Sequence, residues 1–366
     1  MKPIAPTMPS VPAFGALWIA CACLATCAQP RGGTAPADGG ADRPAKVPEA
    51  AEPATVRPGD LAPLADGQRA VFWSSPEDAV PDARVDERHY VHTNERKHYL
   101  YFPYMDCAGG GYVGVGSDQN LTMIARCRAG FAWILDYDEV VVLLHAVHRA
   151  FILESPTPDE FVGRWHLDAR ESSMAVIEKH EAGNPRLGRI KKIFRKYRKN
   201  LLAYFEIRRQ QSFRGEPVTW LSSEEDYAYV RDMYRAGRIR PMLGDLLAGA
   251  AVTGIGGAAR SLGVTVRAIY MSNVEELVRW EKPFKKSMMS LPLDERSVVM
   301  RTLSSVDDYP DADSRWHYNV QSGLDFQERL GGKIKRIQAL MPQRGLTEFK
   351  GLSTLGLAGK SAKGMK

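Results

Sequence analysis

The chain has 366 residues, of which 44% are hydrophobic and 25% charged, and these are ordinary values for a globular protein. This length allows one large domain with insertions or two modest domains. The net charge of +6 is mild for the length, so it does not indicate a nucleic-acid partner, and we expect none.

Residues 1–27 have the features of a secretory signal that ends in a lipidation site. Lys2 is the only charged side chain among them, and an apolar run with many small residues follows it. The run is too short for a convincing membrane-spanning helix. Its end is similar to a bacterial lipobox, with Cys27 as the lipidated residue and Cys23 or Cys21 as alternatives. We expect an exported lipoprotein of the cell envelope; the alternative is a cytoplasmic protein with a weakly apolar start.

Residues 28–69 contain no aromatic side chain and are dominated by Ala, Pro and Gly. Such a segment buries too little apolar surface to offset its chain entropy, so we expect a disordered tether. The globular domain is predicted over 70–343. The Gly-, Ser- and Lys-rich residues 344–366 are predicted to be a flexible tail.

From Gly111 onward the sequence alternates between short apolar runs and helical patterns, which is typical of an α/β fold with parallel strands. A mainly helical insertion is expected at about 156–237, after the second strand. The residues before Gly111 predict a helical or irregular lead-in. The predicted strands are 112–116, 131–138, 238–243, 264–273, 297–303 and 316–321, and the predicted helices are 120–129, 139–155, 246–263 and 274–291.

Two cysteines lie within this alternating region. Cys107 precedes the first predicted strand, and Cys127 lies late in the helix that runs back beside that strand. An exported protein can oxidise such a pair to a disulfide. The alternative is two small buried thiols.

The stretch "GVGSDQN" follows the first strand and opens a helix. Gly114 allows a tight turn, and Gly116 lets a ligand approach the backbone. The N-terminus of the helix then offers free N–H groups. The stretch therefore predicts a binding site for a nucleotide-like cofactor, unless the glycines serve only the backbone geometry of the turn.

Acidic residues end the next two strands. Asp136 lies at the spacing expected for an acid that binds ribose hydroxyls, and Asp138 is the alternative for that role. Asp245 follows the third strand. Because ligands of open parallel sheets bind where the strands end, we expect these carboxylates to share a cleft with the glycine turn.

This order resembles a class I S-adenosylmethionine-dependent methyltransferase domain, a Rossmann-like fold, over about 105–325. The resemblance implies that S-adenosylmethionine is the cofactor. It assigns Gly114 and Gly116 to the glycine-rich motif, Asp136 to the ribose and Asp245 to the adenine. Ser272 and Asn273 would face the methyl group. The wording "YVGVGSDQN … LDYD" is also similar to a group of uncharacterised bacterial proteins with this fold, which implies no activity.

The sequence departs from the methyltransferase pattern at three places. Tyr112 stands where an acid is usual, and Asp118 where a third glycine is usual. A carboxylate at Asp118 disfavours a pyrophosphate but suits the cationic amine and sulfonium of S-adenosylmethionine, so Asp118 is a candidate cofactor residue. The segment "SNVEEL" lacks the Pro-Pro-aromatic signature of amino-group methylation.

Export argues against catalysis, because S-adenosylmethionine is made in the cytoplasm. We therefore expect a non-catalytic or ligand-binding envelope module. The alternative is an S-adenosylmethionine-dependent methyltransferase of unknown substrate. No catalytic residue is assigned.

Residues 186–214 hold eleven Lys or Arg and one acid, Glu206, with apolar and basic side chains on opposite helix faces. This helix is expected either to rest on anionic headgroups or to pack on the domain with a solvated basic face.

The remaining polar residues carry no clear site. His145 and His148 lie three residues apart and His166 follows, but no further ligand has a convincing spacing, so we predict no metal. Four other polar residues either line a cleft or are surface or structural groups: Glu95, His98, His317 and Asn319.

Overall fold

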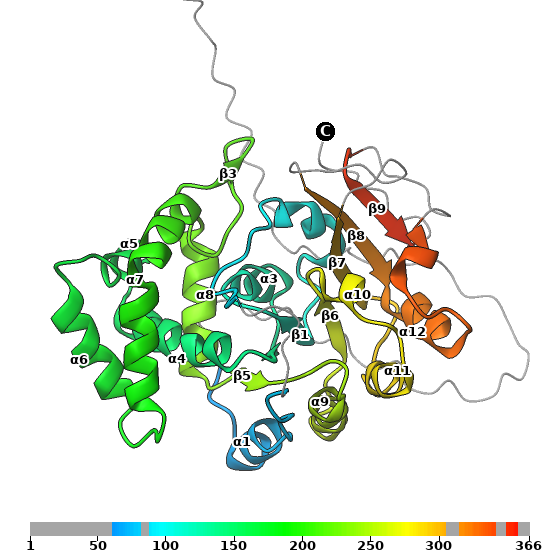
Figure 1. Ribbon diagram of the computed structural model, residues 1–366, viewed down its shortest axis with the longest axis horizontal. Coiled ribbons are helices and arrows are strands. Elements are labelled where there is room, and N and C mark those ends of the chain that lie inside the picture. The colour runs from blue at the N-terminus through cyan, green and yellow to red at the C-terminus, as the bar shows by residue number, and fades with distance from the viewer. Residues whose placement is uncertain (1–60, 82–87, 305–314, 342–348, 358–366) are drawn as a thin grey trace, which may run out of the picture. The chain divides into compact units, whose positions relative to one another are not determined.

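A seven-stranded sheet forms the centre of the fold, in the order β5-β2-β1-β6-β7-β8-β9 (Figure 1). The computed structural model describes residues 61–81, 88–304, 315–341 and 349–357. The strands are β1 (Gly111–Val115), β2 (Phe131–Asp136), β5 (Ile239–Leu243), β6 (Val266–Tyr270), β7 (Val298–Ser304), β8 (Trp316–Ser322) and β9 (Leu352–Leu355).

Neighbouring strands from β5 to β7 are parallel, β8 runs antiparallel to β7, and β9 is parallel to β8. The fold is therefore α/β with a mostly parallel sheet, which is consistent with a Rossmann-like fold. The chain reverses its direction of winding between β1 and β6. Such a switch point is where open parallel sheets bind ligands, at the edge where the strands end. We call this edge of the strands β5 to β7 the carboxyl edge.

Helices cover both faces of the sheet. The helices are α1 (Asp66–Trp73), η1 (His98–Tyr101), α2 (Phe102–Met105), α3 (Gln119–Cys127), α4 (Glu139–Glu154), α5 (Pro158–Gly163), α6 (Arg170–His180), α7 (Leu187–Arg209), α8 (Glu224–Arg235), α9 (Ala250–Ser261), α10 (Val274–Leu277), α11 (Lys282–Met289), α12 (Gly323–Gly331) and η2 (Ile337–Ala339). One core cluster joins α2–α8 to one face, and a second joins α1, α9, α11 and α12 to the other (Figure 1).

The strands bury both of their faces, as parallel strands covered by helices do. Along β1, Tyr112 belongs to the first core cluster and Val113 to the second; along β2, Ile134 and Trp133 divide in the same way. Because all of β1 and all but the last residue of β2 are buried, these two strands appear in the sequence as apolar runs. The six strands that the sequence predicted are all present.

One helix predicted from the sequence is divided into two helices in the structure. The sequence predicted a single helix over 274–291, whereas the structure has α10 and α11 with extended backbone at Val278 between them. Pro283 lies in the first turn of α11. A proline ring there clashes with a helical carbonyl four residues earlier, so the helix cannot run through it.

Two predicted boundaries are wrong. Order begins before Ala70, because Leu64 is buried and α1 starts at Asp66. The expected flexible tail contains β9, which pairs with β8 and buries Leu352 and Leu355. The signal, its three cysteines and the tether up to residue 60 lie outside the described residues. No helix in the described ranges combines the length and apolarity needed to cross a membrane.

Residues 156–237 contain α5, α6, α7 and α8, together with a two-stranded hairpin that the sequence did not predict. The hairpin consists of β3 (Ser212–Phe213) and β4 (Glu216–Pro217). Helix α7 packs along α4, and α8 packs against α3 and α4.

Two histidines of α4 are buried in the first core. His145 donates from Nε2 to the carbonyl of Gly116 at 3.0 Å. Burial lowers the pKa of His145 to about 4. His148 contacts the rings of Phe161, Trp165 and Phe205, and neither of its ring nitrogens has a hydrogen-bond partner among the described residues.

Burial, and then the neighbouring His145, lower the pKa of His148 well below its ordinary value of 6.5. Below pH 6.5 the His148 side chain binds a proton in the unfolded chain, whereas in the folded protein it stays neutral. Stability is therefore fully present above pH 6.5 and falls as the pH decreases.

We predict that His148→Phe makes unfolding less sensitive to acid. The variant keeps an aromatic ring in an aromatic site and removes one proton-binding group from the unfolded state. Below pH 6.5 its free energy of unfolding should fall less steeply, by about 1.4 kcal/mol per pH unit. Urea unfolding across this range measures the slope. The surface variant His166→Gln should keep the wild-type slope, and an unchanged slope in His148→Phe would contradict the account.

Candidate functional site

The glycine turn after β1 is filled by the chain's own side chains. Gly116 has a φ of +94°, which favours glycine. A Cβ at Gly116 would lie 2.5 Å from Nε2 of Gln119, and one at Gly114 would lie 2.2 Å from Oδ1 of Asn120 and 2.3 Å from the hydroxyl of Tyr112. The close approach that both glycines permit is therefore made by internal side chains.

The same side chains close the first turn of α3. Tyr112 donates its hydroxyl proton to Oδ1 of Asn120 at 2.7 Å. The amide of Asn120 donates to the carbonyls of Val115 at 3.0 Å and Ser117 at 2.8 Å. Both side chains are fully buried. The turn is thus held by its own hydrogen bonds.

Asp118 faces the helices and not an open cleft. Its Oδ2 accepts from the hydroxyl of Tyr204 at 3.2 Å and from Nε1 of Trp220 at 3.4 Å. Burial raises the pKa of Asp118, although the charge of Arg208 opposes the rise. The adjoining cavity measures only about 10 Å³, close to the minimum for one water.

A second internal group lies at the carboxyl edge beside the switch point. Oε1 of Glu95 accepts from the hydroxyl of Ser272 at 2.6 Å and from that of Thr302 at 2.7 Å. Ser272 follows β6, and Thr302 lies on β7. Oε2 accepts from the hydroxyl of Tyr270 at 2.7 Å and from Nε2 of His98 at 2.9 Å. We call these five residues the Glu95 cluster.

The Glu95 cluster holds a buried carboxylate in its charged form. Burial alone would raise the pKa of Glu95, but the hydrogen bond and charge of His98 and the hydrogen bonds of Ser272 and Tyr270 hold it below the ordinary 4.5. The segment is fixed from outside as well, since Arg208 donates to the carbonyl of Glu95 at 2.7 Å. The sequence offered Glu95 and His98 only as cleft or structural groups; the structure places both here.

Asp136 and Asp138 lie at the end of β2, as the sequence predicted. Oδ1 of Asp136 accepts the backbone N–H of Asp138 at 2.8 Å, and the Asp136 side chain is partly exposed. Burial, with the nearby charge of Asp138, raises the pKa of Asp136 to about 7. Asp138 caps α4 by accepting from Val140 at 3.0 Å, and its other oxygen bonds Nδ1 of His89 at 2.6 Å.

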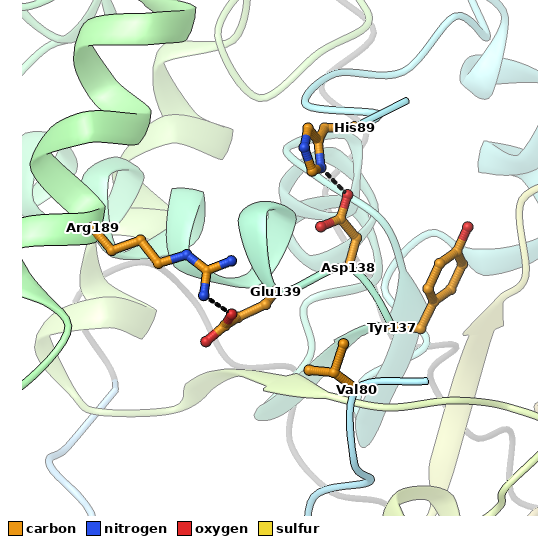
Figure 2. Close-up of a pocket in the computed structure, with 6 residues that line it drawn as sticks. All are labelled: Val80, His89, Tyr137, Asp138, Glu139 and Arg189. Carbon is orange, nitrogen blue, oxygen red and sulfur yellow. Dashed lines mark hydrogen bonds and ion pairs between the residues drawn. The ribbon is translucent and has the colours of Figure 1, made fainter. Parts of the chain in front are cut away.

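A cavity of about 130 Å³ opens beside these acids. Figure 2 shows Arg189 and Glu139, joined by an ion pair, on one side and His89, Asp138 and Tyr137 on the other. Val80 completes the lining. The volume is below the roughly 300 Å³ at which pockets for drug-sized ligands begin.

Asp245 does not line this cavity, and its carboxylate forms a hydrogen bond within its own loop. Its Oδ1 accepts from the backbone of Leu247 at 2.8 Å. Its N–H donates at 3.0 Å to Asp78, whose carboxylate also binds the backbone N–H of Ala250 at 3.0 Å and of Ala251 at 3.3 Å. Asp78 therefore occupies the N-terminus of α9. The sequence analysis missed Asp78, whose partners lie far along the chain.

The predicted cofactor residues therefore do not share one cleft in the structure. Asn273 caps the backbone of α10, where its carbonyl accepts from Glu276. The neighbouring Ser272 turns into the Glu95 cluster with a φ of +48°. Among the predicted acids, only Asp138 lines the larger cavity, with Asp136 next to it in sequence. His317 and Asn319 bond Ser353 in the interior of the sheet.

The predicted Cys107–Cys127 disulfide is not formed. Cys127 is a free, fully buried thiol that contacts the carbonyl of Ile124 at 3.6 Å. Burial raises its pKa to about 12. Its side chain packs into the core and is not available to Cys107.

Across the described ranges, no three or more His, Cys, Asp or Glu side chains are arranged to hold a metal ion.

We predict that Glu95→Ala lowers the free energy of unfolding by about 4 kcal/mol at neutral pH, because it leaves buried donors without an acceptor. Denaturant unfolding measures this change. The matched variant Glu171→Ala removes an exposed carboxylate and should change stability by less than about 0.5 kcal/mol. Equal stabilities for the two variants would show that the cluster does not hold the segment.

Comparison with known proteins places the chain in a protein family. A family model described as Domain of unknown function (DUF7790) matches residues 90–356. This range contains the Glu95 cluster, the glycine turn and Asp136, and it leaves out His89 and Val80 of the cavity. The search of curated proteins found no match.

Proposed function

Because the chain belongs to this family, whose domain has no known function, we propose a function from its own residues: a non-catalytic, ligand-binding module of the cell envelope. The observation that carries the proposal is the filled carboxyl edge. Gln119, Asn120 and Tyr112 occupy the glycine turn, and Glu95 occupies the position beside the switch point. A catalyst that uses a nucleotide-like cofactor needs this edge open.

The place of action follows from the N-terminal sequence. The signal-like residues 1–27 and the tether after them support export and lipidation at Cys27, with Cys23 and Cys21 as alternatives. An exported domain has no supply of S-adenosylmethionine, which agrees with a binding role in place of methyl transfer.

The relationship we propose is to the methyltransferase-like Rossmann folds. The strand order supports it, because β5-β2-β1-β6-β7 reverses between β1 and β6 as doubly wound sheets do. In this account residues 156–237, with the helices α5–α8, are an insertion after the second strand. The ancestral cofactor position would then be the one that the Glu95 cluster and the glycine turn now fill.

The ligand we propose is a small hydroxyl-rich molecule of sugar size, bound in the cavity at the end of β2. Asp138 supplies a carboxylate at the cavity wall that accepts from hydroxyl groups, and Arg189 and His89 supply donors beside it. The volume of about 130 Å³ suits a small ligand better than a whole nucleoside cofactor.

A second candidate function is an S-adenosylmethionine-dependent methyltransferase of unknown substrate. Asp136 favours it, since this acid ends β2 at the position where Rossmann-like folds bind ribose hydroxyls. The candidate requires the side chains in the glycine turn to move out of the cofactor's way.

Calorimetric titration of the full-length chain separates the two candidates. D-ribose and S-adenosylmethionine are the probes, with Asp138→Asn and Asp136→Asn as the test variants and Asp168→Asn as a control on the surface. The proposal expects weak, millimolar binding of ribose that Asp138→Asn abolishes, and no tight binding of S-adenosylmethionine. Micromolar binding of S-adenosylmethionine that needs Asp136 would favour the methyltransferase. No binding of any probe would contradict the proposed ligand.

We predict that Asp136→Asn stabilises the protein in mild alkali. The folded pKa of about 7 lies above the ordinary 3.8, so the contribution of Asp136 to stability is present at low pH and is lost as the pH rises through 7. Asparagine removes this loss. Melting temperatures measured from about pH 5 to about pH 8 should diverge in favour of the variant. Parallel curves would contradict the account.

A further inference from the structure

Helix α7 presents two chemically different faces. Its apolar face packs against α4 and α5 through buried side chains that include Ile190, Phe194, Leu201 and Phe205. The sequence predicted this face. The helix is 23 residues long and lies among the green helices of Figure 1, beside α4 and α6.

Many cations of α7 have partners within the protein. Arg189 pairs with Glu139, and Lys191 pairs with Glu178. At the end of the helix, Arg209 pairs with Asp159 at 2.6 Å. These charges are balanced internally and explain part of the basic composition of the segment.

Four further cations form a group that we call the basic face: Lys192, Arg195, Lys196 and Lys199. All four are exposed and lie on successive turns of one side of the helix. None forms an ion pair with a carboxylate in the part of the chain that the structure describes; Arg195 bonds a backbone carbonyl, and Lys196 lies over the ring of Tyr197.

An unbalanced basic face costs stability in the free protein. Lys192 and Lys196, and likewise Arg195 and Lys199, are like charges four residues apart, a spacing that destabilises helices. An anionic partner that covers the face offsets this repulsion. The face is therefore better explained by a surface of phosphates than by the packing of α7.

The same side of the helix ends in an apolar residue. Ile207 follows Lys196 by eleven residues, or about three turns, and is 69% exposed. Nucleic acid offers phosphates but no apolar layer, whereas the interface of a bilayer offers both within a few ångströms. The combination favours a lipid surface over a nucleic acid.

We propose that the basic face and Ile207 dock the domain on a bilayer rich in anionic, phosphate-bearing headgroups. This inference goes beyond the ligand-binding function and does not depend on the cavity at β2. With each cation near such a surface contributing about fivefold, the four together strengthen binding by several hundredfold, roughly, at low salt.

The test uses the full-length chain made without acylation, so that no lipid anchor contributes. Co-sedimentation compares phosphatidylcholine vesicles with and without phosphatidylglycerol. The test variant carries Lys192→Gln, Arg195→Gln, Lys196→Gln and Lys199→Gln. The control removes the same charge from exposed lysines on the opposite side of the sheet: Lys282→Gln, Lys286→Gln, Lys333→Gln and Lys335→Gln.

The proposal expects the wild type and the control to bind the anionic vesicles, and the α7 variant to lose at least about a hundredfold in affinity. Ile207→Ser should weaken binding to the anionic vesicles while leaving the fold unchanged. If both quadruple variants lost the same affinity for anionic vesicles, net charge alone would explain the binding and the proposal would be overturned. Duplex DNA that displaces the protein from anionic vesicles at equal phosphate concentration would overturn the choice of a lipid surface.

Discussion

The carboxylate of Glu95 is the interaction on which the carboxyl edge depends. It is fully buried and receives four hydrogen bonds, from Tyr270, Ser272, Thr302 and His98. A buried charge without partners would cost several kcal/mol, so the residues around it must stay in place. The segment before β1 is thereby tied to the ends of β6 and β7. In this fold the switch point beside them would otherwise be the natural place for a ligand.

The segment is fixed through its backbone as well as through Glu95. The N–H groups of Arg96 and Lys97 donate to the hydroxyl of Tyr318 on β8 at 3.1 and 2.8 Å. Together with the filled glycine turn, these bonds leave the end of β2 as the more open part of the edge. A Rossmann-like sheet does not by itself imply cofactor chemistry, and the side chains that fill the glycine turn support the proposed binding role. The basic face shares helix α7 with Arg189 of the cavity, but none of its four cations lines the cavity, so membrane docking and ligand binding can be tested with different variants.

Local patterns in the sequence were sufficient for much of the fold. The apolar runs at β1 and β2 and the glycine turn between β1 and α3 follow from periodicity and from the conformational freedom of Gly116. Strand β9 was missed because four residues in a Gly- and Ser-rich stretch carry little signal until β8 is beside them. The Glu95 cluster was beyond such reasoning, since Glu95 meets Tyr270 across 175 residues and Thr302 across 207. Likewise, nothing local shows that Gln119 fills the space beside Gly116.

The central claim is that the carboxyl edge is closed by the chain's own side chains. Amide hydrogen exchange in the glycine turn and in the Glu95 segment, with and without saturating S-adenosylhomocysteine, tests it most directly. The account predicts slow exchange in both segments and no change on addition of the compound. Fast exchange in the Glu95 segment, together with protection of the glycine turn by the compound, would contradict it and identify an open cofactor site.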